Sequence, residues 1–126
     1  MRVAVALVLL AALGLARAAD SGLSFTDAKA VWEASKDRTE YLAYASQFLQ
    51  FISHSRPDNL NGCYALGKDP LELMLVVGHR DSEQYMVVEV LSNVESEKVQ
   101  CLRKSYGGLP MKAPPFFPFV LRMGVG

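Results

Sequence analysis

The segment Leu109–Pro118 restricts the possible folds of this chain more than any other stretch. Its four prolines are Pro110, Pro114, Pro115 and Pro118. Proline lacks the backbone N–H that helix interiors and central strands use, and it biases the preceding residue toward extended geometry. We therefore predict a stiff extended connector at this position, outside any helix or inner strand.

The residues after the connector alternate in a pattern of period two. Phe119, Leu121, Met123 and Val125 alternate with the residues between them, which predicts a C-terminal strand. A proline-rich run is also typical of ligands for aromatic grooves, but Phe116, Phe117 and Phe119 carry a large apolar area. We therefore expect these rings to be buried and the connector to have a structural role.

The first 18 residues are typical of a secretory signal peptide. Arg2 precedes an apolar run from Val3 to Leu15, and Ala16-Arg17-Ala18 is a small-residue cleavage site. The run is shorter than the roughly 20 residues of a spanning helix. We predict a mature chain from Ala19 to Gly126, without a membrane span after cleavage. This chain of 108 residues has the size of a single domain.

The charge of the mature chain argues against nucleic acid as a partner. Without Arg2 and Arg17, 11 basic residues face 13 acidic ones, and no segment carries a basic stripe. Cys63 and Cys101 are the only cysteines. Since the signal peptide directs the chain to an oxidising compartment, we predict that they form one disulfide and do not bind zinc.

The residues from 24 to 54 have helical periodicity. Ser24-x-x-Asp27 and Asp37-x-x-Glu40 are both helix-start signals, so the region is either one long helix or two abutting ones. Pro57 and the turn formers after it end the helical region.

The residues from 71 to 126 change to strand patterns. Two apolar runs, LELMLVVG and YMVVEVL, flank the polar HRDSEQ and predict an antiparallel hairpin. Ser92-x-x-Glu95 predicts a capped helix with a stripe formed by Val94, Val99, Leu102 and Tyr106. The fold class is therefore α+β, with an N-terminal helical part (24–54) followed by a ββαβ unit (71–126) and a small antiparallel sheet.

The second half also resembles a known family. The pattern YMVVEVL … VESEKVQCLRKSYGGLPMKAPPFFPFVLRM resembles the C-terminal domain of TonB-type proteins, most closely its small secreted relatives with a helix cysteine and a proline tract. The resemblance covers Leu71–Gly126. It implies a periplasmic protein whose terminal strand lies at a sheet edge and accepts a partner's extended peptide by strand addition. Energy transducers of this family also keep an uncleaved inner-membrane helix and a long proline-rich spacer. We expect neither in this chain, so the resemblance implies the fold and not the transducing activity.

The titratable residues give little support for an enzyme. His54 is expected at a solvated helix end and His79 in an exposed turn, and the disulfide would remove both thiols as nucleophiles. Aromatic residues at helical spacing are typical of a core rather than a binding face; they are Trp32, Tyr41, Tyr44, Phe48 and Phe51. We predict a non-enzymatic protein without catalytic, metal or cofactor-binding residues.

Two functions of different classes remain open. The first is a periplasmic module that binds an envelope protein or an extended peptide through a sheet edge, formed by Phe119, Leu121, Met123 and Val125. The second is an inhibitor or immunity-type protein that blocks a secreted enzyme with its hairpin loop, through Arg80, Asp81 and Glu83. A hydrophobic edge strand favours the first function, and a charged loop tip favours the second.

Overall fold

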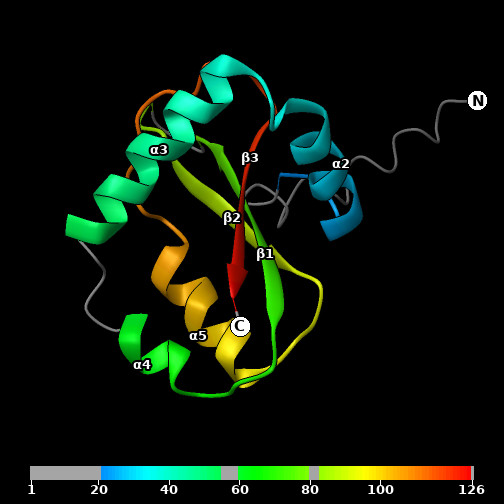
Figure 1. The fold of residues 1–126 in the computed structure, drawn as a ribbon, viewed down its shortest axis with the longest axis vertical. Helices are drawn as coiled ribbons and strands as arrows, with labels where there is room; N and C mark the ends of the chain where they lie inside the picture. The colour runs from blue at the N-terminus through cyan, green and yellow to red at the C-terminus, as the bar shows by residue number, and fades with distance from the viewer. Residues whose placement is uncertain (1–20, 55–59, 80–82, 126) are drawn as a thin grey trace, which may run out of the picture.

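The fold is α+β, as the sequence predicts. The computed structural model describes residues 21–54, 60–79 and 83–125. The elements, in chain order, are α2 (Phe25–Ser35), α3 (Thr39–His54), α4 (Leu60–Tyr64), β1 (Leu71–Gly78), β2 (Met86–Ser92), α5 (Glu97–Tyr106) and β3 (Phe119–Val125) (Figure 1). The predicted signal peptide and the predicted start at Ala19 lie outside the described residues.

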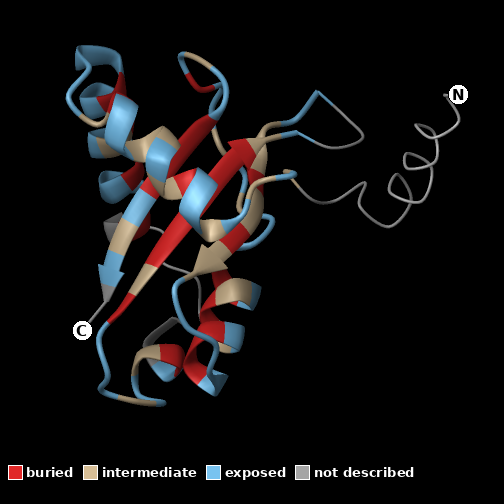
Figure 2. Cartoon of the chain, turned by 90° about the vertical axis from the view of Figure 1, so that its right-hand side faces the viewer, coloured by how far each residue is buried: buried red, intermediate tan, exposed pale blue. Residues whose placement is uncertain are grey.

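The three strands form one antiparallel sheet in the order β2-β1-β3. At the centre, Leu75 lies opposite Val90 of β2 and opposite Leu121 of β3. Every residue of β1 from Leu73 to Val77 is buried, which explains its continuous apolar run (Figure 2). A strand buried on both faces has no polar face to alternate with its apolar one.

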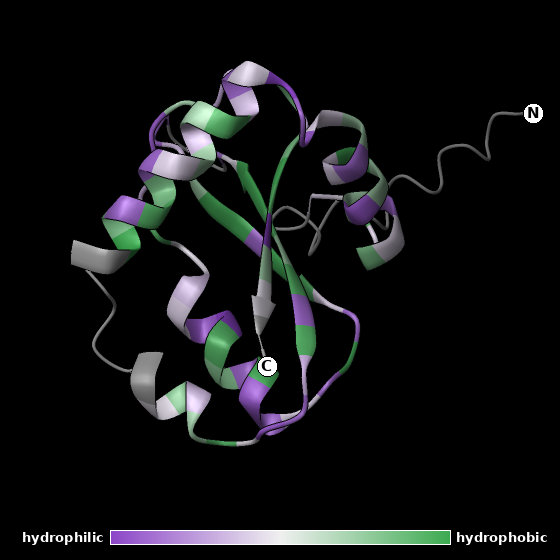
Figure 3. Cartoon of the chain, viewed as in Figure 1, coloured by the Kyte–Doolittle hydropathy of each residue, from purple (hydrophilic) through white to green (hydrophobic). Residues whose placement is uncertain are grey.

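Helices cover both faces of the sheet, with α2 on one side and α3 and α5 on the other (Figure 1). On the α2 face, Ala28 packs with Met74, Val76 and Val120. The opposite face holds the larger core, where Phe119 contacts the rings of Tyr41 and Tyr44 at centroid distances of 5.3 and 4.6 Å. Hydrophobic residues dominate the strands, whereas hydrophilic ones recur along the helices (Figure 3).

The helical first half consists of two helices. The start of α2 is the predicted capping box, in which Ser24 Oγ accepts from the Asp27 N–H at 3.0 Å and the Asp27 carboxylate accepts from the Ser24 N–H. Residues 36–38 separate α2 from α3. Because these helices lie on opposite faces of the sheet, this short turn connects the two layers.

The predicted start of α5 is wrong. Ser96 is the N-cap and accepts from the Val99 N–H at 3.1 Å, whereas Ser92 is the last residue of β2 and lies opposite Leu73. A residue that still belongs to a strand cannot cap a helix three residues later. Val94 is accordingly 44% exposed and lies outside the helix, while Val99, Leu102 and Tyr106 form the buried stripe as predicted.

The proline segment is a connector between α5 and β3, with one isolated bridge between Pro110 and Met86. Phe119 is fully buried and Phe116 partly buried, but the expectation that Phe117 is buried is wrong, since it is 58% exposed. Phe116 packs on Phe119 with ring centroids 5.2 Å apart. Phe117 instead stacks on Tyr85 of the hairpin, outside the main core.

Cys63 and Cys101 form the predicted disulfide, with an S–S distance of 1.98 Å and Cα atoms 5.3 Å apart. The bond joins α4 to α5, and Cys63 is completely buried. The disulfide therefore links the two short helices, and its Cys63 side chain is part of the larger core.

Candidate functional site

The direction of the β1 backbone decides which residues of β3 face outward. The N–H and C=O of Glu72 both bond to Asn93, on the β2 side of β1, through the Asn93 side chain and backbone. Backbone groups alternate in direction along a strand, so Leu71, Leu73, Leu75 and Val77 point toward β3.

Phe119, Leu121, Met123 and Val125 lie opposite these residues, so their backbone groups bond to β1. The side chains of Phe119 and Leu121 are buried in the larger core. The outward-facing backbone groups belong to Val120, Arg122 and Gly124. The prediction of a partner-binding edge on this strand stays a prediction, but a partner would meet these alternate residues.

Trp32 and Tyr41 cover the edge of β3 near Arg122. Trp32 packs against both hydrophobic clusters, which the sheet separates, so its side chain passes around the edge. Burial raises the pKa of Tyr41, and hydrogen bonding from the Trp32 side chain and the Arg122 backbone partly opposes that rise. The Tyr41 hydroxyl and Trp32 therefore lie beside the outward backbone of Arg122.

The edge is open one step further along, at Gly124. In the described part of the chain, no hydrogen bond reaches the outward backbone groups of this residue. The space where a Gly124 side chain would begin is bordered by the Arg122 guanidinium, whose Nη1 lies 3.6 Å from the position of a Cβ atom. Gly124 therefore combines an accessible backbone with a neighbouring cation.

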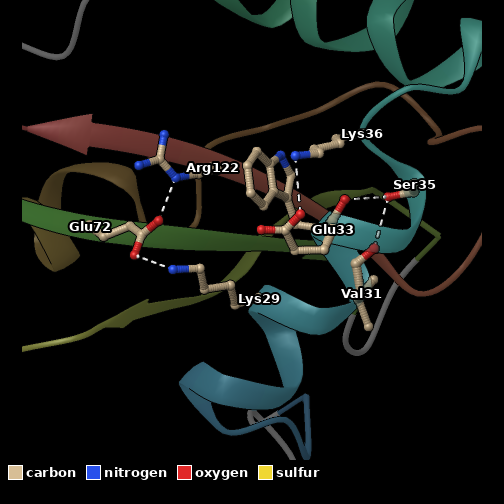
Figure 4. A network of polar contacts seen from close by, with 8 residues as sticks. Lys29, Val31, Glu33, Ser35, Lys36, Glu72 and Arg122 are labelled. Carbon is tan, nitrogen blue, oxygen red and sulfur yellow. Dashed lines mark hydrogen bonds and ion pairs between the residues drawn. The ribbon is translucent and has the colours of Figure 1, made fainter.

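Arg122 belongs to a charged network on the α2 face (Figure 4). Its Nε donates to Glu72, and Lys29 of α2 donates to the other oxygen of the same carboxylate at 3.1 Å. Hydrogen bonding to Arg122 is the main cause that lowers the pKa of Glu72. The guanidinium also lies over the Trp32 ring, 5.3 Å from its centroid. This network fixes the Arg122 side chain beside the open end of the edge.

The other sheet edge, on β2, is covered in part by the chain itself. Val87 donates to Leu109 and accepts from Gly108, and Tyr85 accepts from Met111, with N···O distances of 2.8 to 3.0 Å. Further along, Arg103 of α5 donates to the Val90 carbonyl at 3.0 Å. The Tyr85 carbonyl, both backbone groups of Val87 and the Val90 carbonyl therefore have partners on this side.

A groove of about 590 Å³ lies between α3 and the connector. Tyr44 ties the two walls together, because its hydroxyl donates to the Lys112 carbonyl at 2.6 Å, and burial raises the pKa of Tyr44 to about 12. The lining is mostly apolar and consists of Tyr44, Gln47, Phe48, Gln50, Phe51, Pro110, Met111 and Lys112. Phe51, predicted to be core, is 37% exposed at this groove, whereas Tyr41, Tyr44 and Phe48 are buried as predicted.

The alternative loop site is described only in part. Arg80 and Asp81 lie outside the described residues, and Glu83 is exposed. Nearby, the rings of His79 and Tyr85 meet edge-to-face at 5.2 Å, and Tyr85 stacks on Phe117 at 5.9 Å. The base of the hairpin turn therefore carries a small aromatic cluster, while the side chain of His54 is not described.

Sequence reasoning missed Arg122 and Gly124 at the edge and Trp32 across it. The period-two pattern contained part of the signal, because it placed Arg122 and Gly124 on the opposite strand phase from Phe119 and Leu121. It did not show that the backbone of this phase faces outward. That direction depends on the pairing of β1 with β2.

The described ranges hold no group of three or more His, Cys, Asp or Glu side chains that could bind a metal ion. Within the same ranges, no helix has the length and apolar character needed to cross a membrane. Comparison with known proteins found no matching family model, no matching curated protein and no matching solved structure. The function therefore has to be inferred from the geometry of this chain.

Proposed function

We propose that this chain is an exported, non-enzymatic binding module that adds an extended segment of an envelope protein to the outer edge of β3. The observation that carries the proposal is the outward backbone of Gly124, which has no hydrogen-bond partner among the described residues. An unpaired N–H and C=O at a sheet edge are a template for another strand.

The contrast between the two edges supports the choice of β3. A strand added beside β2 would have to displace backbone hydrogen bonds to Gly108, Leu109 and Met111. A strand added at Gly124 displaces none in the described part of the chain, although Trp32 and Tyr41 limit its extension past Arg122. The complex would therefore be short, and side-chain contacts would supply much of its affinity.

The disulfide supports the exported part of the proposal, because such bonds persist in oxidising compartments. The ββαβ order with β1 in the centre is compatible with the resemblance to TonB-type C-terminal domains. We keep that resemblance as part of the proposal, and with it the periplasmic location.

A pair of variants at Gly124 tests the proposal. Octapeptides selected from a random phage-displayed library against the parent protein serve as the probe. Gly124→Pro removes the outward N–H, whereas Gly124→Ala keeps it and places its Cβ at an ordinary contact distance from Arg122. We expect the selected peptides to bind the parent and the alanine variant alike, and to bind the proline variant roughly tenfold more weakly. Equal binding to all three proteins would refute strand addition at β3.

A second candidate function is inhibition of a secreted enzyme through the hairpin turn. The stacked Tyr85 and Phe117 support it, because an exposed aromatic ring beside a charged loop is a common anchor at interfaces. Alanine at Arg80, Asp81, Glu83 and Phe117 would then abolish binding of the selected peptides, while Gly124→Pro would leave it intact. We expect the opposite pattern.

A further inference from the structure

Gly124 leaves room above the open edge, and the Arg122 side chain occupies it. Nη1, Nη2 and Cζ of Arg122 lie 3.6, 3.8 and 3.9 Å from the position that a Cβ atom of Gly124 would have. Arg122 lies on the α2 face of the sheet, because it bonds to the Glu72 carboxylate that Lys29 of α2 also binds. Gly124 is two positions further along the same strand and therefore shares this face. The guanidinium is therefore adjacent to the backbone that an added strand would contact.

The outer nitrogens of this guanidinium face solvent. The Arg122 side chain is 38% exposed, and its contact with Glu72 uses Nε. In the described ranges, no hydrogen bond runs from Nη1 or Nη2, and Figure 4 shows both pointing away from Glu72. Two N–H-bearing nitrogens in one plane are the geometry that binds a carboxylate in a bidentate manner.

The local charge also favours an anion. Lys29 and Arg122 share the single carboxylate of Glu72, so the three side chains together carry a net charge of +1. The other acidic residue of this network, Glu33, pairs with Lys36. An incoming carboxylate would balance the excess charge at the open end of the edge.

We propose that the added segment carries an aspartate or glutamate opposite Gly124, and that its side chain binds Arg122 Nη1 and Nη2. This inference rests on the proposed strand addition. A residue paired with Gly124 would have its Cα about 5.5 Å away and its side chain on the α2 face, the face that Arg122 occupies. Its neighbours along the segment would point to the opposite face, toward α3. The acid is therefore specified at one position in the register.

The test uses the octapeptides selected on the parent protein. The strongest binder is synthesised in three forms: as selected, with its acid changed to the matching amide, and with the acid moved by one position. Each form is titrated by calorimetry against the parent, Arg122→Gln and Lys29→Gln. Lys29→Gln is the matched control, because Lys29 also binds Glu72 but belongs to α2 and does not border Gly124.

We expect the selected peptides to be enriched in an acid at one position. Changing or moving that acid should weaken binding to the parent and to Lys29→Gln roughly tenfold or more, and should have little effect on binding to Arg122→Gln. Arg122→Lys, which keeps the charge without the planar fork, should give an intermediate loss. The peptide changes on the parent do not depend on the folding of any variant.

Two different failures remain distinguishable. Peptides that need the Gly124 N–H but bind equally well with acid or amide would overturn the inference and leave strand addition intact. Peptides that bind Gly124→Pro as well as Gly124→Ala, or a library without binders, would overturn both.

Discussion

The two edges of the sheet are protected in different ways. On β2, the backbone of residues 108–111 and the Arg103 side chain provide hydrogen-bond partners for Tyr85, Val87 and the Val90 carbonyl. On β3, Trp32 and Tyr41 cover the edge at Arg122 with side chains and leave Gly124 uncovered. Backbone hydrogen bonds cover part of β2, whereas the side chains on β3 cover only the residues that they reach. In the described ranges, this difference leaves the backbone of Gly124 accessible on the β3 edge.

The largest expected effect concerns the elements that cover the β2 edge. Arg103 is on α5, and residues 108–111 follow it directly, so both depend on the disulfide that joins α5 to α4. We expect the double variant Cys63→Ala, Cys101→Ala to lose roughly 4 kcal/mol of unfolding free energy, given the 38-residue separation and the chain-entropy model.

Urea unfolding of the variant and of the parent measures this loss, and the parent in reductant is the control. A loss below about 1 kcal/mol would contradict the prediction. It would mean that the packing of α5 against β2 suffices to cover that edge.

The second prediction compares two adjacent residues of β3. The N–H of Met123 faces Leu73 of β1, whereas that of Gly124 faces outward. We expect Met123→Pro to cost about 1–3 kcal/mol more than Met123→Ala, because a carbonyl of β1 loses its donor. Gly124→Pro should change the unfolding free energy little. Similar unfolding midpoints for the two proline variants would refute the assignment of inward and outward residues.

These assignments also mark the limit of what the sequence predicts. The apolar run of β1 predicted a strand. It did not show that this strand is central in the sheet, because that position depends on its partners. Ser92 and Ser96 both fit a capping pattern, and only the length of β2 decides between them. The alternation after Pro118 separated Leu121 from Arg122, while the pairing of Arg122 with Glu72, 50 residues earlier, has no local signal. Fold class and disulfide were predictable, and the accessible backbone was not.

A third prediction compares one covering side chain from each edge. Arg103→Ala should cost about 1.5–3 kcal/mol, because the Val90 carbonyl loses a charged donor. Tyr41→Phe should cost about 1 kcal/mol, because it removes the hydroxyl that lies beside Trp32 and the Arg122 backbone.

Amide hydrogen exchange distinguishes the two variants by location. Exchange at Arg122 should accelerate in Tyr41→Phe and stay unchanged in Arg103→Ala. Faster exchange at Arg122 in both variants would show that the edges are not protected independently.

The smallest expected effect is the pH dependence of the stability that the Glu72–Arg122 contact between β1 and β3 provides. The pKa of Glu72 is lowered, chiefly by its hydrogen bond to Arg122, so the folded state binds this proton less readily than the unfolded state. The stabilisation is therefore complete above the unfolded pKa, about 4.3, and is lost as the pH falls through the lower folded value. The pKa of Glu40 is lowered chiefly by a hydrogen bond from its own backbone and then by Arg38, and that of Glu95 by Arg103, so both contribute with the same sign. Unfolding midpoints in urea, measured from pH 6 to pH 2, should fall less steeply for Glu72→Gln than for the parent. The Glu83→Gln variant, changed at an exposed carboxyl of the hairpin, should follow the parent curve. If Glu72→Gln also follows it, the carboxylate does not stabilise the position of β3 against β1, and the orientation of Arg122 beside Gly124 would have to come from its contact with Trp32.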